Sequence, residues 1–152
     1  MAAGAVTLYS INKDDLNIND LVGATVNLAL VTSSYTPDVT VTGHNEWADV
    51  SANEITTAGG YTTGGQALTS KVATSITGGF KFSSASPTWT ATGGSIDAWR
   101  YGVLYVVGSL WGLTNPVIGY FVGDSTPANI PATTVGNTLT VTVPANGWFD
   151  AV

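Results

Sequence analysis

The sequence predicts an all-β fold, a single-domain antiparallel β-sandwich or small Greek-key barrel with an N-terminal arm. Short β-prone runs recur between glycine, proline and asparagine residues, and no window keeps the apolar spacing of an amphipathic helix beyond two turns. The chain has 152 residues and no cysteine. A single domain of this length buries about 70% of the surface that its unfolded chain exposes, so it can be stable without disulfides. We divide the chain into residues 1–20, an N-terminal arm or a first strand, and residues 21–152, a β domain.

The clearest strand patterns lie in three segments. Residues 24–32 place Val26, Leu28 and Leu30 on one face. Residues 99–107 are apolar on both faces, which is typical of a central strand between packed layers. Residues 138–143 alternate threonine with Leu139 and two valines. Further strands are expected at residues 72–77, 79–83, 88–92 and 117–122, and the glycine doublets between them predict tight turns.

The first twenty residues combine a β-prone segment with a polar stretch. The segment TLYSI, residues 7–11, suits a paired strand, and NKDDLNIND, residues 12–20, suits a tether. We therefore expect a docking arm that uses Leu8, Tyr9 and Ile11 to add a strand to a sheet edge of another subunit. The alternative is an ordinary first strand and loop of the chain's own sheet.

The charge composition indicates which partners to expect. Only 9% of residues are charged, against about 25% in typical soluble domains. We infer a neutral surface that partner subunits cover in part, and we expect a homotrimer. The formal charge of −6 disfavours nucleic-acid binding. The longest apolar stretch, residues 101–113, is shorter than the roughly 20 residues of a membrane helix, and MAAGAV lacks the basic region of a signal peptide, so no membrane partner is expected.

The motifs that resemble catalytic sites have simpler interpretations. Ser51 and Glu54 have the spacing of a capping box, which predicts a short helical turn. Asp49 and Glu54 could instead flank a glycosidic bond, but turn chemistry accounts for Asp49. The only histidine, His44, lies in an apparent exposed turn, and no G-x-S-x-G motif supplies a nucleophile for it. We therefore predict that the chain is not an enzyme.

The polar and glycine-rich segments do not predict a cofactor. In the stretch after Lys13, a calcium loop starting at Asp15 would need glycine where Asp20 stands and glutamate where Val26 stands. A solvated segment is the simpler interpretation, with an adventitious divalent ion as the alternative. The glycine run at residues 59–65 is followed by Gln66, where a phosphate-binding loop needs lysine. No cofactor or metal is therefore expected.

The aromatic residues give the main functional signal. Trp89 and Trp99 lie in or beside strand patterns and are expected in the core. Other aromatics lie in turn-like surroundings or after the last turn, and such residues anchor protein interfaces or stack on sugars. The candidate interface residues are Leu8, Tyr9, Ile11, Trp47, Trp111, Trp148 and Phe149.

The central part of the chain resembles small virion proteins of tailed bacteriophages, the capsid decoration or cement type. The motifs are a strand ending in LLTS-Y-TP, then D-V-S-A-N-E, then GY-T-GG. Here they correspond to Leu30, Val31, Thr32 and Ser33; Tyr35, Thr36 and Pro37; residues 49–54; and Gly60, Tyr61, Thr62, Gly64 and Gly65.

This resemblance implies a structural role in the virion. The chain would be a decoration (cement) protein that binds the outer capsid surface, contacts the major capsid protein and stabilises the contacts between capsomers. The alternative is a carbohydrate- or receptor-binding module of a head fibre or tail fibre. A hydrolase is the weakest candidate, because one histidine and scattered acids do not assemble a site.

Overall fold

The structure, a computed structural model, describes residues 1–13, 15–123 and 129–152, and for Ile11 the backbone alone. It confirms the all-β fold. A five-stranded sheet, the central sheet, has antiparallel neighbours throughout. Its order is β1 (Thr7–Leu8), β10 (Val117–Val122), β7 (Tyr101–Val107), β2 (Thr25–Val31) and β3 (Gln66–Ala67).

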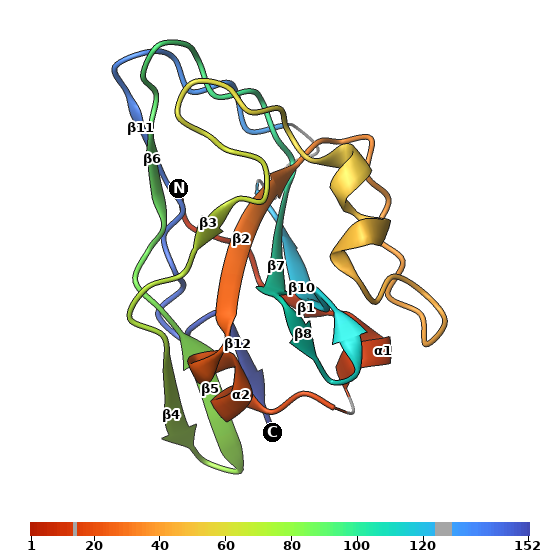
Figure 1. The fold of residues 1–152 in the computed structure, drawn as a ribbon. Helices are drawn as coiled ribbons and strands as arrows, with labels where there is room; N and C mark the ends of the chain where they lie inside the picture. Colours follow the sequence, from red (N-terminus) through yellow and green to blue (C-terminus); the bar gives the residue numbers. More distant parts are fainter. Residues whose placement is uncertain (14, 124–128) are drawn as a thin grey trace.

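Smaller sheets and short helices surround the central sheet (Figure 1). We call the three-stranded one the side sheet, with the order β12 (Phe149–Ala151), β5 (Gly79–Ser83) and β4 (Val72–Ile76). The other pairs are β11 (Thr138–Thr140) with β6 (Thr88–Thr90), and β8 (Ser109–Leu110) with β9 (Leu113–Thr114). The helical segments are α1 (Ser10–Lys13), α2 (Ile18–Gly23), η1 (Trp47–Asp49) and η2 (Ser51–Asn53).

One face of the central sheet packs on the smaller sheets and forms the main core. The alternation of β2 places Val26, Leu28 and Leu30 there, as the sequence predicts. Trp89 and Trp99 join them, with 6% and 1% of their surface exposed. The fold is therefore sandwich-like, with apolar side chains of the central sheet facing those of the side sheet and the β6–β11 pair.

The opposite face of the central sheet is also covered, because β7 is apolar on both sides. Val103 and Tyr105 of β7 pack there with Val31, Tyr35 and Val50. Tyr35 and Val50 belong to the long connection after β2, which contains η1 and η2. The sequence prediction of a central strand between packed layers is thus confirmed for β7.

The first twenty residues do not project as an arm. Thr7 and Leu8 pair with Tyr120 and Gly119 at the edge of the chain's own central sheet. The expected polar tether, residues 12–20, instead overlaps the end of α1 and the start of α2, and Asn17 caps α2 by accepting a hydrogen bond from the Asn19 amide at 3.0 Å. The arm is therefore corrected to the alternative, a first strand. The pairing with β10 and the burial of apolar side chains make that arrangement favourable.

The predicted capping box is also corrected. Residues 51–53 form a helical turn, but no side chain caps it. Glu54 instead accepts hydrogen bonds from the Tyr61 hydroxyl at 2.6 Å and from the Gly64 amide at 2.7 Å. The reciprocal box is formed one turn earlier by Glu46 and Asp49. Spacing alone predicted the wrong pair, because the tertiary partners of Glu54 outcompete the local one.

Candidate functional site

The candidate site is a cleft in a fork between the first and last strands. The two segments begin side by side, since Ala2 forms a parallel bridge with Thr142 and the Ala3 amide donates to the Thr142 carbonyl at 2.9 Å. They then separate. The N-terminal segment joins the central sheet through β1, while the C-terminal segment turns and joins the side sheet through β12.

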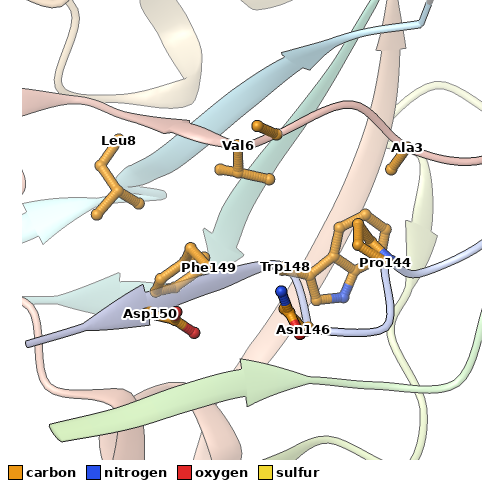
Figure 2. A pocket seen from close by; sticks show the side chains of 10 residues that line it. Ala3, Val6, Leu8, Pro144, Asn146, Trp148, Phe149 and Asp150 are labelled. Carbon is orange, nitrogen blue, oxygen red and sulfur yellow. The ribbon is translucent and has the colours of Figure 1, made fainter.

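The space inside this fork, which we call the fork cleft, has a volume of about 380 Å³. That volume lies within the roughly 300–1,000 Å³ of ligand pockets. Figure 2 shows Val6 and Leu8 on the wall formed by the N-terminal segment, with Trp148 and Phe149 on the opposite wall. The complete lining is Ala3, Ala5, Val6, Leu8, Pro144, Asn146, Gly147, Trp148, Phe149 and Asp150.

Two further hollows continue the fork cleft along β12. The first, of about 270 Å³, shares Leu8 and Asp150 with the cleft, and the second, of about 370 Å³, shares Leu16 and Ala151 with the first. The second hollow also reaches Phe80, which is 45% exposed. Together the hollows form an elongated, mainly apolar groove along one edge of the sandwich.

A tight turn shapes the C-terminal wall. Gly147 has a φ of +82°, and its amide donates to the Pro144 carbonyl at 2.8 Å. A Cβ at this position would lie 2.5 Å from the Phe82 carbonyl oxygen, so the turn requires glycine. Next along the chain, Trp148 donates its backbone amide to the same oxygen at 2.7 Å and its indole N–H to the Ser84 hydroxyl at 2.9 Å. Backbone and side-chain hydrogen bonds therefore hold this wall to β5 and to the residue that follows it.

The structure brings three of the candidate interface residues into the fork cleft, namely Leu8, Trp148 and Phe149. Of these, Leu8 is half-buried, whereas Trp148 and Phe149 are only 2% and 7% exposed. Tyr9 is fully buried in the tyrosine-rich core. The expectation that Tyr9, Trp148 and Phe149 are exposed interface anchors is therefore corrected: their rings stabilise the chain's own fold. The side chain of Ile11 lies outside the described part of the chain.

Trp47 and Trp111 lie away from the fork cleft, and both are half-buried. Trp47 stacks on Tyr105, with ring centroids 4.4 Å apart and an interplanar angle of 8°. Trp111 lies in the β8–β9 turn with a φ of +54°, and its indole N–H is 3.4 Å from an Asp20 carboxylate oxygen. The predicted set of interface residues is thus divided among separate regions of the molecule.

A hydrogen-bonded aromatic cluster lies on the other face of the central sheet. The hydroxyls of Tyr9 and Tyr35 are 2.5 Å apart, and the Tyr35 hydroxyl is 2.9 Å from Nδ1 of His44. Burial raises the pKa of Tyr35 to about 12, and it raises the pKa of Tyr9 as well. Tyr101 and Tyr120 extend the cluster through edge-on contacts. We call these five residues the tyrosine cluster.

A second polar network ties Glu54 to the glycine-rich segment. Besides donating to Glu54, the Tyr61 hydroxyl accepts the Leu30 amide of β2 at 3.0 Å. The Gly64 carbonyl accepts the hydroxyl of Tyr105 at 2.7 Å. Burial raises the pKa of Glu54, while the hydrogen bonds from Tyr61 and Gly64 oppose that shift. This carboxylate therefore has a structural role in connecting residues 60–65 to the central sheet.

The other sequence motifs can also be placed. Asp49 accepts the amides of Asn45 and Glu46 at 3.1 and 3.2 Å, which accounts for its position. His44 is half-buried against Tyr35 rather than in an exposed turn. Among the described residues, no cluster of three or more His, Asp or Glu side chains is arranged to bind a metal ion. Within the same residues, no helix has the length and apolarity needed to span a membrane.

Sequence reasoning missed several residues of the fork cleft, notably Val6, Asn146 and Asp150. These residues lie near opposite ends of the sequence, and no local sequence pattern indicates that they come together in the fold. The one usable signal was the turn before Trp148, which indicated an ordered last segment. Comparison with protein-family models, with curated proteins and with solved structures finds no match for this chain.

Proposed function

We propose that this chain is a structural protein of a phage particle, a decoration (cement) protein that binds the major capsid protein on the outer capsid surface. The observation that carries the proposal is the fork cleft with its continuation along β12, an elongated apolar groove on a chain with only 9% charged residues. Such a groove on a weakly charged surface suits a protein partner. The resemblance of residues 30–65 to virion proteins supplies the kind of partner.

The mechanism in this proposal is burial of surface across subunit boundaries. Each apolar contact contributes about 25 cal/mol per Å², before the costs of association are subtracted. A trimer would engage several capsomers at once, so the rupture of a capsid would have to break several interfaces together. No step of this mechanism requires catalysis or a cofactor.

Binding to particles tests the proposal directly. Purified capsids that lack the protein are mixed with the purified chain and sedimented, and their resistance to heat is then measured by release of the packaged DNA. We expect saturable binding and a higher release temperature. Failure to sediment with capsids at micromolar concentration would overturn the proposal. Light scattering of the free chain tests the trimer separately, because capsid binding can also drive oligomerisation.

A second candidate function is binding of a glycan by a fibre module. It is favoured by another hollow of about 280 Å³ beside Trp89, whose lining includes Thr62, Gln66 and Thr88. The Gln66 side-chain oxygen is buried without a hydrogen-bond partner, so a ligand hydroxyl could satisfy it. Trp89 is only 6% exposed, which leaves little ring surface for stacking on a sugar. A glycan array with wild type and Gln66→Ala distinguishes this candidate from decoration.

A further inference from the structure

Each wall of the fork cleft contains an edge strand. β1 lies at one edge of the central sheet, opposite β3, and β12 lies at one edge of the side sheet, opposite β4. β12 pairs with β5 on one side, through Phe149 opposite Phe82 and Ala151 opposite Phe80. An edge strand presents a row of backbone N–H and C=O groups to any chain that can lie beside it. The groove therefore offers main-chain partners as well as apolar side chains.

The net charge of the chain, rather than that of the groove itself, favours a basic partner segment. Asp150 lines the fork cleft and the first hollow, and Asp15 lines the second; both are exposed. Lys13 lines the first hollow, and Lys81 stands opposite Asp150 across the β5–β12 ladder, so two basic side chains balance the two acidic ones. The chain as a whole carries −6. An approaching segment with lysine or arginine is attracted by this field, whereas an acidic segment is repelled.

We propose that the fork cleft binds an extended segment of the partner protein, which adds a strand to the outer edge of β12. The segment is apolar at alternate positions, since one of its faces meets the half-buried side chains of Val6 and Leu8, and it carries a lysine or arginine that reaches Asp150. This inference rests on the proposed capsid binding and deepens it by naming the chemistry of the bound segment. Main-chain hydrogen bonds supply the affinity and the alternating side chains set the register.

The structure provides a blocking variant with a matched control. Ala5 lines the fork cleft and is itself exposed, so Ala5→Trp fills the cleft without removing a core side chain. Ala52 is likewise an exposed alanine, in η2 and outside the cleft, so Ala52→Trp controls for an added indole. Asp150→Lys tests the charge, and Asp97→Lys makes the same charge change at another exposed position. Circular dichroism establishes that each variant is folded.

The experiment measures binding of these variants to purified capsids that lack the protein, together with amide hydrogen exchange of the bound and free chain. We expect Ala5→Trp and Asp150→Lys to weaken binding at least tenfold, and the two controls to leave it unchanged. We also expect the amides of residues 148–152 to exchange more slowly on capsids.

The outcomes separate the two proposals. If the wild type binds capsids but Ala5→Trp binds equally well and residues 148–152 gain no protection, the strand-addition proposal is wrong and the capsid proposal stands. If the wild type does not bind capsids, both fail. Slower exchange of residues 148–152 at rising protein concentration, without capsids, would assign the cleft to a second copy of this chain and overturn the choice of partner.

Discussion

The tyrosine cluster and the fork cleft are both built from aromatic and apolar side chains at the central sheet, but only the first is closed at its centre, where Tyr9 and Tyr35 are buried. The connection after β2 covers the tyrosine cluster, and the polar atoms of Tyr9, Tyr35 and His44 satisfy one another there. In the fork cleft, by contrast, two edge strands diverge and leave about 380 Å³ between them.

The difference shows what decides whether an aromatic surface is available to a partner. In the tyrosine cluster, the buried hydroxyls of Tyr9 and Tyr35 find partners within the chain, so covering them costs little. In the fork cleft, the rings of Trp148 and Phe149 are already buried, and what stays open is the space and the backbone edge beside them. Aromatic content alone therefore did not identify the open surface.

The largest effect is expected from deleting residues 2–12. The deletion removes β1, the fully buried Tyr9, and Asn12, whose side-chain amide donates to the carbonyls of Asn45 and Val117 at 2.8 and 2.7 Å. It therefore damages both the cleft wall and the tyrosine cluster. We expect loss of the cooperative thermal transition in circular dichroism. A folded truncated chain would show that the segment is dispensable, as a docking arm would be.

The second-largest effect on stability is expected from Trp148→Ala. The ring is 2% exposed and stacks on Phe121 at a centroid distance of 5.9 Å. We expect a loss of about 3–5 kcal/mol in the free energy of unfolding of the isolated chain, measured with urea. Trp148→Phe, which keeps most of the ring contacts, should cost less. An unchanged midpoint for Trp148→Ala, together with weaker capsid binding, would mean that the residue serves assembly alone.

Two conservative substitutions in the tyrosine cluster should differ from each other. Tyr35→Phe removes the hydroxyl that contacts both Tyr9 and His44, so it leaves the buried Tyr9 hydroxyl without a partner and should cost about 2–3 kcal/mol. Tyr9→Phe leaves the Tyr35 hydroxyl with His44 and should cost about 1 kcal/mol. Urea unfolding of both variants gives the comparison. Equal costs would show that the His44 contact contributes nothing.

The smallest effect is expected from the ionisation of Tyr35 at alkaline pH. The folded pKa of Tyr35 is raised from 10.0 to about 12. The stabilisation linked to a raised pKa is complete below the unfolded pKa and is lost as the pH rises through the folded one. The raised pKa values of Tyr9, Tyr61 and Tyr105 act in the same direction. We therefore expect the free energy of unfolding to fall between pH 10 and 12, with about 1 kcal/mol of the loss at pH 11 due to Tyr35 after allowing for solvent screening. Tyr35→Phe should reduce this dependence.

The sequence by itself determined the strand content and most of the core. Periodicity placed β2, β5, β7 and β10 with boundary errors of at most two residues, because burial on one or both faces of a strand leaves a direct pattern of apolar side chains. It did not predict α2, although Asn17 followed by Ile18, Leu21 and Val22 has the cap and spacing of a short helix. Six residues are too few for that pattern to stand out from the surrounding polar stretch.

Only the tertiary structure decided how the two ends of the chain are used. The sequence suggested that Leu8, Trp148 and Phe149 serve an interface, but their shared location depends on Ala2 meeting Thr142 and on the two segments then joining different sheets. Pairing between residues so distant in sequence produces no local sequence pattern. It depends instead on how all the strands together bury their apolar side chains in the sandwich. For the same reason the sequence could not separate the buried Tyr9 from a docking arm.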